Sequence, residues 1–519
     1  MWIALAAIIL YAIWYSVSYA DGPSFFGDDN AYAGLANQIL TSNFHEGGYI
    51  FSVRPLQIYP IALSFWALGI NIPSSSAWDS IAFIGTVIAC FFIGKELYNE
   101  YAGLLSALLM AFFPLVTVLA VSMSDNVPMM FVSALAFMCL IYAMKYSSKR
   151  WYMAAGIFTI AAPLTTPEAY ITLIALFSLV AIELLRGKIK LDKTTIYFAY
   201  GLIAASAILM AFNFASSGDP LITFTVNENY FSAIGQQNTI PAADQSLTLY
   251  PSVIFPFNLW QLLLQNFPNL LGVISGISIL GNYNQVGFYF YLLIPAAAYL
   301  LLKRERRAYI PLYWFLFTFL YLEFGPMHVG LSPFEYLLSH KVGRFLCLCA
   351  VPLVVTIAMA SARSLEPGSL LRRYAAASIV CASVALLVLT GFLISAYWHT
   401  IVVHQTYDQV VMAGYLSQQP PSTKIYFTGT FSNMLLYMRF ENMSRFYAYD
   451  NIKNCSQIPD GAYIVLPKFQ QVFGLDYTPD PSGYCPKWQL VLSPQIPVPY
   501  DPVAEGAARF SEGRLYYNP

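Results

Sequence analysis

The sequence predicts a polytopic α-helical membrane protein of about eleven transmembrane helices, with a small extracytoplasmic α/β domain at its C-terminal end. Hydrophobic residues make up 58% of the 519 residues and charged residues only 10%, and the mean hydropathy is +0.57. A water-soluble domain usually carries about 25% charged residues, so the composition excludes a soluble globular protein. The net charge of -1 gives no electrostatic reason to expect a nucleic-acid partner.

The predicted spans are the nearly continuous apolar runs that are long enough to cross about 30 Å of hydrocarbon. They lie at residues 2–20, 77–97, 101–120, 126–145, 151–167, 169–185, 195–213, 285–302, 308–324, 343–361 and 374–396. The first run ends in Ser18-Tyr19-Ala20, which is also compatible with a signal-peptide cleavage site, although no basic segment precedes it. We expect this span to be retained, and its removal would leave the remaining topology unchanged.

Basic residues are distributed unevenly between two sets of loops. If the N-terminus is cytoplasmic, fifteen Lys and Arg residues fall in five short inner loops, whereas the outer loops contain only Arg54, Lys341 and Arg344. Cytoplasmic loops are the ones that are enriched in Lys and Arg. The asymmetry therefore predicts a cytoplasmic N-terminus and, because eleven is odd, an extracytoplasmic C-terminal region, in a plasma membrane or an equivalent membrane.

The chain divides into two predicted domains. Residues 1–396 form the membrane domain, whose long outer loops are 21–76 and 214–284, and residues 397–519 form the outer domain. In the outer domain short β-like runs alternate with Pro, Gly and Asn turns. Its only cysteines are Cys455 and Cys485, which can form a disulfide in an oxidising compartment, two free thiols being the alternative.

The stretch GDDNAYAGLANQIL, residues 27–40, follows the first span and pairs two adjacent acids, Asp28 and Asp29. Its apolar residues have helical spacing and predict an amphipathic helix along the outer membrane interface; they are Tyr32, Leu35, Ala36, Ile39 and Leu40. Asp28 alone is explained by a helix cap. A second carboxylate beside it adds repulsion unless a cation, a metal or a substrate hydroxyl is present to use it.

Other ionisable residues are predicted on the same side of the membrane. Asp125 lies in SMSDNVP between the third and fourth spans, and Glu168 lies in TTPEAY between the fifth and sixth. Each is also compatible with a plain helix-terminal acid. Arg54, Lys341 and Arg344 are cations on that side, for which anchoring at the interface is the alternative to phosphate binding.

The acidic stretch resembles a motif of a known family. GDDNAYAGLA is similar to the first-loop motif of the GT-C glycosyltransferases, in the branch of the dolichyl-phosphate-mannose protein mannosyltransferases and the lipid A aminoarabinose transferase. In that motif Asp-Glu is followed after two residues by Tyr-Ala. Asp28, Asp29, Tyr32 and Ala33 match this frame, with Asp in place of Glu.

Further segments resemble the family in the same order along residues 1–400. RPLQIYPIALSFWALGI is similar to its Pro-Pro-Leu juxtamembrane segment, although only Pro55-Leu56 is present. SDNVPMMF resembles the second acidic loop, which carries Asp125 over. LTTPEAY resembles a Thr-basic-x-Glu turn but lacks the basic residue, and KVGRFLCLCAVPLVV is similar to an Arg-Tyr helix and indicates Arg344.

The resemblance implies an inverting glycosyltransferase that moves a sugar from a polyprenyl-phosphate donor to a hydroxyl of a glycan, lipid or protein acceptor. One acid of the first loop would be the general base, and Asp28 is preferred over Asp29 because it fills the first position of the acid pair. Substrate-binding residues would be Tyr32, Arg54, Asp125, Glu168, Lys341 and Arg344. Asp28, Asp29, Asp125 and Glu168 can also be grouped as ligands of Mg²⁺ or Mn²⁺.

Two other functions are compatible with a membrane protein of this kind. An oligosaccharyltransferase has the same architecture, but its Trp-Trp-Asp-Tyr-Gly motif is absent from the outer domain. A transporter or flippase of a lipid-linked substrate would be expected to carry charges in mid-membrane. Here the candidate charges lie at the outer ends of spans, which favours the transferase.

Overall fold

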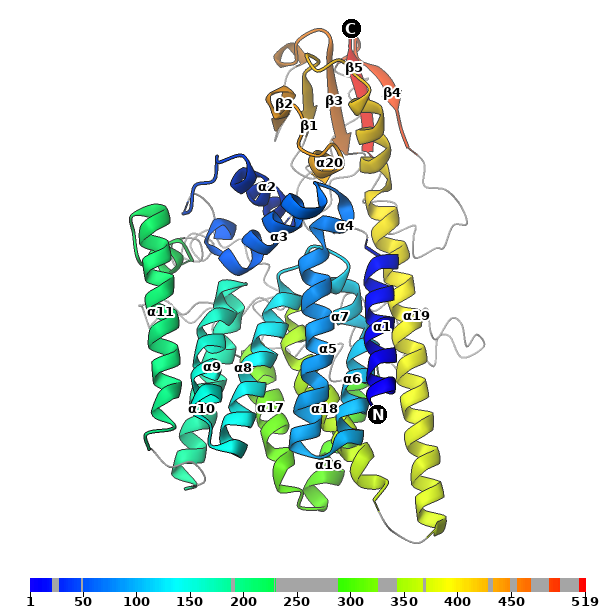
Figure 1. The fold of residues 1–519 in the computed structure, drawn as a ribbon. Helices are drawn as coiled ribbons and strands as arrows, with labels where there is room; N and C mark the ends of the chain where they lie inside the picture. The colour runs from blue at the N-terminus through cyan, green and yellow to red at the C-terminus, as the bar shows by residue number, and fades with distance from the viewer. Residues whose placement is uncertain are drawn as a thin grey trace.

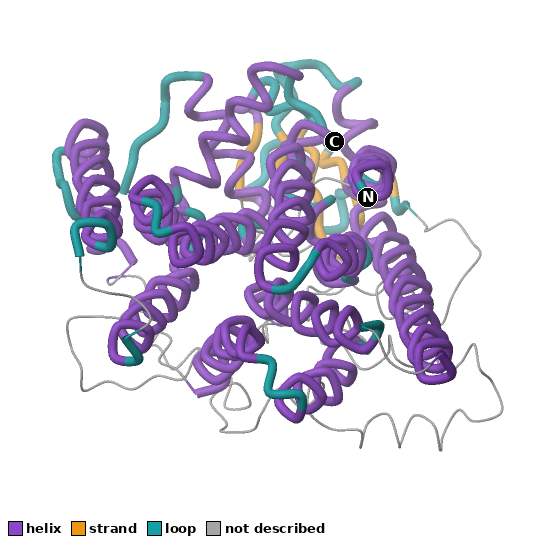
Figure 2. The backbone as a smooth tube through the Cα atoms, turned by 60° about the horizontal axis from the view of Figure 1, so that its bottom comes forward, coloured by secondary structure: helices purple, strands orange, loops and turns teal. Residues whose placement is uncertain are grey.

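The structure is a computed structural model that describes residues 1–20, 28–47, 50–187, 192–227, 229, 288–324, 343–366, 370–427, 433–448, 455–467, 485–494 and 513–519. Long helices run side by side and form a bundle, and a small sheet lies at one end of it (Figure 1). Figure 2 brings the other end forward and shows that the strands are confined to the region near the C-terminus. The predicted fold class is confirmed.

Helix is present in every one of the eleven predicted spans. The helices are α1 (Trp2–Ser18), α5 (Ala77–Leu97), α6 (Glu100–Ala111), α7 (Pro114–Ala120), α8 (Asn126–Tyr146), α9 (Lys149–Ala161), α10 (Tyr170–Leu185), α11 (Ile196–Ser217), α16 (Tyr289–Leu302), α17 (Tyr309–Phe324), α18 (Cys347–Ser364) and α19 (Leu370–Ser417). Within the described residues, six helical segments are long and apolar enough to cross a membrane, or seven if α6 and α7 count as one bent span. The other predicted spans contain shorter helices. Most of the predicted loop 214–284 lies outside the described residues.

The third predicted span is broken between α6 and α7, which are bent by 59°. Pro114 begins α7, and the N–H of Phe113 donates to Met110 instead of Leu109. The carbonyl of Leu109 is satisfied by the hydroxyl of Tyr289, at 3.0 Å. Since a kink frees backbone groups that lipid cannot hydrogen-bond, this side chain makes the break tolerable inside the bundle.

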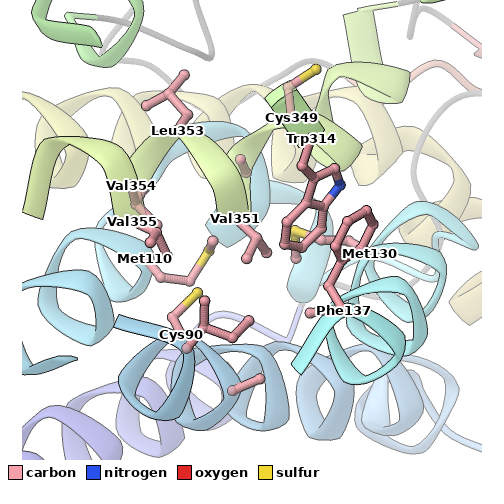
Figure 3. Packing of buried hydrophobic residues seen from close by; sticks show 14 of the residues in the cluster. Cys90, Met110, Met130, Phe137, Trp314, Cys349, Val351, Leu353, Val354 and Val355 are labelled. Atoms are coloured by element: carbon pink, nitrogen blue, oxygen red, sulfur yellow. The ribbon is translucent and has the colours of Figure 1, made fainter. Parts of the chain in front are cut away.

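Close packing of α5, α8, α17 and α18 forms the centre of the membrane domain. Phe137 of α8 and Trp314 of α17 stack with ring centroids 3.8 Å apart (Figure 3). Small residues allow other helices to approach, as is common in membranes. Gly391 of α19 lies directly against the break, because a Cβ added there would be 2.0 Å from the carbonyl oxygen of Phe112.

The first outer loop contains helices of its own, at the end of the bundle that also bears the sheet (Figure 1). These are α2 (Asp28–Leu40), α3 (Pro55–Leu68) and α4 (Ile72–Ser75), with a 3-10 turn, η1 (Ile50–Val53). The predicted apolar stripe of α2 packs against α3 through Tyr32, Leu35 and Ala36, which are buried. Asn30 of α2 is also buried. Helix α3, which the sequence analysis did not predict, packs against α2.

The C-terminal domain contains a five-stranded sheet of order β2-β1-β3-β5-β4. Its elements are β1 (Ile425–Phe427), α20 (Asn433–Tyr437), β2 (Phe446–Ala448), β3 (Ala462–Pro467), β4 (Gln489–Leu492) and β5 (Gly513–Asn518). Strands β2, β1 and β3 are parallel, and β5 is antiparallel to β3 and β4. The domain boundary expected after residue 396 falls inside α19, which runs from the membrane bundle into this domain.

Helix α19 and α20 cover one face of the sheet. Arg445 is buried and donates to the carbonyls of Leu416, Gln419 and Pro420, which satisfies the C-terminal end of α19. On the other face a disulfide joins Cys455 to Cys485 beside Ile464 and Tyr516. The sheet is therefore joined to the membrane domain by the continuous helix α19.

Candidate active site

A buried ion pair joins the first outer loop to the turn before α8. Nη1 of Arg54 lies 2.5 Å from Oδ2 of Asp125, with side-chain exposures of 7% and 10%. The hydroxyl of Tyr32 donates to the same carboxylate oxygen at 2.7 Å, and Nη1 of Arg54 also donates to the Tyr32 oxygen. Three residues that the sequence singled out as binding residues thus form one network.

Local structure explains why each of these side chains is held in place. Arg54 directly precedes the proline that begins α3, and its guanidinium lies 4.5 Å from the ring centroid of Phe51. Tyr32 is on the buried face of α2 and packs edge to face on Phe51. A cation beside aromatic faces is favourably solvated in a site with little water.

Asp125 occupies the N-cap position of α8, but its side chain makes no capping hydrogen bond. Its Oδ1 instead accepts from the side-chain amide of Asn126 at 2.9 Å, and that amide also donates to Ser124. The side chain of Asp125 therefore does not cap α8 through a hydrogen bond. The turn before α8 places this carboxylate in contact with Arg54 and Tyr32.

Asp79 is a member of this site that the sequence analysis missed. It lies in the first turn of α5, is fully buried, and its Oδ1 accepts from the backbone N–H of Ser124 at 3.1 Å. Asp79 also interacts electrostatically with Asp29 and Asp125. The sequence does contain an indication of Asp79, because an acidic residue inside an otherwise apolar span is a candidate functional residue.

The acid pair of the first loop begins α2. Asp29 is 2% exposed and, through its interaction with Asp79, belongs to the same site. The side chain of Asp28 is outside the described residues, so its predicted role stays a prediction. In the described part of the chain the site contains three carboxylates and one guanidinium. A carboxylate close to the reacting hydroxyl is a group that can act as a general base.

The remaining predicted site residues are not joined to this network within the described part of the chain. The carboxylate of Glu168 accepts from the hydroxyl of Thr166 in its own turn, η3 (Pro167–Ala169). Lys341 and the side chain of Arg344 lie outside the described residues. Of the three predicted phosphate-binding cations, Arg54 is the one whose position is known.

The C-terminal domain packs against the same site. Leu436 of α20 and Phe440, which follows it, belong to one buried cluster with Tyr32, Phe51 and Met123. Met123 is two residues from Asp125, and Phe51 lies under Arg54. Phe440 adopts a left-handed backbone with a φ of 51°, an unusual conformation for a bulky residue. The outer domain therefore contacts the residues that support the ion pair.

A protein-family model described as dolichyl-phosphate-mannose-protein mannosyltransferase matches residues 52–211. This range contains Arg54, Asp79, Asp125 and Glu168. ArnT from Cupriavidus metallidurans, bound to undecaprenyl phosphate, has a similar structure over 100% of this chain and 98% of that chain, with a TM-score of 0.57 and 12% identity. The chain has the GT-C fold. The resemblance that the sequence predicted is thus supported at the level of the fold.

Two archaeal structures share the GT-C fold. AglB from Archaeoglobus fulgidus, an oligosaccharyltransferase in complex with an inhibitory peptide and a dolichol-phosphate, matches 89% of this chain and 69% of that chain, with a TM-score of 0.53 and 12% identity. The oligosaccharyltransferase of the same organism in complex with zinc and sulfate matches 89% and 67%, with a TM-score of 0.54 and 13% identity. No curated protein matches the sequence at a significant level.

The expected divalent cation was tested against the donor groups of the site. Among the described residues, no three or more His, Cys, Asp or Glu side chains are grouped as metal ligands. Glu168 is turned to Thr166, and Asp125 is taken by Arg54, Tyr32 and Asn126. The described residues alone do not fit Mg²⁺ or Mn²⁺, so no chemical step is assigned to a metal here.

Proposed function

We propose that this protein is an inverting glycosyltransferase that takes a sugar from a polyprenyl-phosphate donor and passes it to an acceptor hydroxyl. The observation that carries the proposal is the buried network of Arg54, Tyr32 and Asp125, with Asp29 and Asp79 beside it, at one end of a GT-C helix bundle. A cation next to carboxylates is the pair of groups that transfer from a lipid phosphate requires.

The reaction assigns one task to each charge. A carboxylate of the Asp28–Asp29 pair accepts the proton of the acceptor hydroxyl, whose oxygen attacks the anomeric carbon of the sugar. The bond from that carbon to the phosphate oxygen breaks, and its electron pair leaves with the polyprenyl phosphate. Arg54 stabilises this anionic leaving group in a buried site where a fixed charge acts strongly. Attack from the face opposite the phosphate inverts the anomeric centre.

Asp125 keeps Arg54 in position before the donor arrives. A buried guanidinium without a counter-ion would cost several kcal/mol, on the order of the penalty for an unpaired buried charge. A guanidinium has five N–H donors, so one group can contact both a carboxylate and a phosphate. The pairing of Arg54 with Asp125 is therefore compatible with phosphate binding.

The donor class is proposed from the chemistry of the site and from the lipids bound to similar structures, undecaprenyl phosphate in ArnT and a dolichol-phosphate in AglB. The sugar is proposed to be a hexose or an aminosugar carried on such a lipid. The acceptor is proposed to be a hydroxyl on a glycan, lipid or protein at the extracytoplasmic face, where the C-terminal domain closes over the site.

Sugar transfer by the purified protein tests the proposal. The protein is incubated with dolichyl-phosphate-mannose, or with undecaprenyl phosphate carrying aminoarabinose, and the release of free polyprenyl phosphate is measured with acceptors of each class. We expect release that depends on the acceptor and a product of inverted anomeric configuration. A parallel reaction with a chelator, followed by added Mn²⁺, determines metal dependence. Movement of an intact donor across proteoliposomes without release would instead identify a flippase.

A further inference from the structure

Three buried polar side chains beside the ion pair have atoms without a hydrogen-bond partner in the described part of the chain. These atoms are Oδ1 of Asn30, both Oε1 and Nε2 of Gln57, and Oδ2 of Asp79. Gln57 and Asp79 are 0% exposed and Asn30 is 9% exposed. Because a buried polar group without a partner is costly, folded proteins keep few of them, and several in one place need an explanation.

Each of the three residues is attached to a different element of the active site. Gln57 is in the first turn of α3, and its N–H donates to the carbonyl of Arg54 at 3.0 Å. Asn30 follows Asp29 on α2, and Asp79 on α5 holds Ser124, the neighbour of Asp125. Since α3 packs on both α2 and α5, the three residues lie on helices that meet, and each is linked by sequence or by a hydrogen bond to a residue of the network.

The chemistry of the unsatisfied atoms indicates what they bind. Three of the four are oxygen acceptors and the fourth, Nε2 of Gln57, is a donor. An ionised phosphate offers only acceptors, so it cannot satisfy the amide oxygen of Asn30. A metal cation would satisfy the oxygens but would leave the amide N–H₂ of Gln57 without a partner. Sugar hydroxyls both donate and accept, so they are chemically suited to all four atoms.

We propose that Gln57, together with Asp79 and Asn30, binds hydroxyl groups of the sugar carried by the donor, so that the site recognises the sugar and Arg54 recognises the phosphate. This inference rests on the proposed function and adds to it the groups that hold the transferred residue. Gln57 is the most informative of the three because its amide carries no charge, so its replacement leaves the electrostatics of the network intact.

Substitution Gln57→Leu tests the inference, because leucine keeps much of the volume and removes both unsatisfied atoms. Binding of dolichyl-phosphate-mannose and of undecaprenyl phosphate carrying aminoarabinose is compared with binding of the same lipid phosphates without sugar. We expect the affinity of the variant for the sugar-loaded lipid to fall about 10-fold, the scale of one or two hydrogen bonds. Affinity for the bare lipid phosphate should be unchanged.

The melting temperature of the ligand-free protein is the second measurement. Removing buried, unsatisfied polar atoms should leave it equal or raise it, so a loss of sugar binding cannot be attributed to unfolding. Gln38→Leu, at an exposed position of α2, is the matched control and should bind both lipids as the native protein does. Asp79→Asn, which keeps the shape of the side chain, should also weaken binding of the sugar-loaded lipid.

Three outcomes separate this inference from the function on which it rests. If the native protein binds neither form of lipid phosphate, the proposed function is wrong. If it binds both forms and Gln57→Leu binds the sugar-loaded lipid as tightly as the native protein, only the sugar-binding role is wrong. If Gln57→Leu abolishes stabilisation by Mn²⁺ and leaves the preference for sugar unchanged, these atoms are metal ligands and the inference is overturned.

Discussion

Arg54 and Asp125 are 71 residues apart in sequence and in direct contact through Nη1 and Oδ2, at 2.5 Å. One belongs to the first outer loop and the other to the turn that begins α8, so the pair ties the loop helices to the membrane bundle. Both side chains are almost fully buried. A buried ion pair contributes little net stability compared with an apolar pair, but removing one partner leaves an unpaired charge.

Breaking this pair from one side should destabilise the protein. Arg54→Met leaves Asp125 without its cation, and we expect a loss of about 3–5 kcal/mol in the free energy of unfolding. The double variant Arg54→Met with Asp125→Leu removes both charges and should recover most of that stability. Thermal unfolding of the purified variants measures both effects.

The same variants distinguish a structural role of Arg54 from a role in sugar transfer. If Arg54 stabilises the leaving phosphate, the stable double variant should still fail to transfer sugar. A double variant that recovered both stability and transfer would limit the pair to a structural role. Lys95→Met, at a partly exposed ion pair in the last turn of α5, is a control in which the stability change should stay below about 1 kcal/mol.

The acid pair of α2 gives a second prediction. Asp28→Asn preserves capping ability, because Asn caps helices as well as Asp, but it removes the ability to take a proton. If Asp28 is the general base, turnover should fall by about 10² to 10⁴ while the melting temperature is unchanged. Initial rates of sugar transfer at saturating donor measure this change.

Asp29→Asn assigns the role within the pair. The structure places Asp29 in the site, so this variant should lose activity by a similar factor if Asp29 is the base, and by much less if Asp28 is. Glu100→Gln, an exposed carboxylate at the other end of the bundle, should be silent. Normal transfer by both Asn variants would leave the acid pair with a capping role alone.

Sequence reasoning found the charged residues of the site that stand in polar loops, and it missed those inside apolar segments. Asp125 and Arg54 are charged residues between hydrophobic spans, so the sequence indicated them as candidate site residues. Their direct contact was not, because it depends on α3, which packs the loop onto the bundle. Asp79 was overlooked because a single acid hardly changes the hydropathy of a span, and Gln57 because burial of an amide depends on tertiary packing.

The ends and bends of the helices were less predictable than their positions, because they also depend on tertiary packing. The apolar run ends at residue 396, but α19 continues to Ser417, where Met412, Ala413 and Leu416 pack under the sheet. Similarly, the break between α6 and α7 follows from Pro114 and from the hydroxyl of Tyr289. An apolar run gives the position of a span, whereas its bends and extensions come from partners distant in sequence.

Asp408 makes the docking of the outer domain dependent on pH. It lies on the extension of α19, and its Oδ2 accepts from the N–H of Gly513 in β5 at 2.9 Å. Burial raises the pKa of Asp408 from 3.8 to about 7. The native carboxyl therefore keeps its proton up to about pH 7, while the unfolded chain loses it above about pH 4. Stability of this contact should fall as pH rises from 4 to 7 and then level off.

The variant Asp408→Asn should remove this dependence, because the amide keeps an oxygen acceptor for Gly513 and carries no charge. We expect it to be more stable than the native protein at pH 8, by up to about 4 kcal/mol, and similar at pH 4. Thermal unfolding across this pH range measures the difference. Asp460→Asn, at an exposed turn of the same domain, should follow the native curve, and an identical curve for Asp408→Asn would contradict the assignment.

The disulfide between Cys455 and Cys485 closes a loop with a sequence separation of 30. A loop of this length predicts a stabilisation of about 3–4 kcal/mol through restriction of the unfolded chain. Cys455→Ser should lower the free energy of unfolding of the outer domain by that amount, and reduction of the native protein should have the same effect. Alkylation of the peptides that contain Cys455 and Cys485 after reduction, but not before it, checks that the bond is formed.

The orientation of the chain remains a prediction from its basic loops, and it determines which compartment the active site faces. Helices α2 and α3, which bear Asp29 and follow Arg54, lie with the outer domain at one end of the bundle (Figure 1), so locating that domain locates these helices. Gln418→Cys introduces a thiol at an exposed position just after α19, in a protein with Cys381→Ser to remove the exposed native thiol. A membrane-impermeant thiol reagent should label Gln418→Cys in intact cells. A matched variant at the exposed inner-loop position, Arg150→Cys, should be labelled only after lysis. The reverse pattern would place the acid pair and Arg54 in the cytoplasm, and the donor would then have to be presented on the inner leaflet.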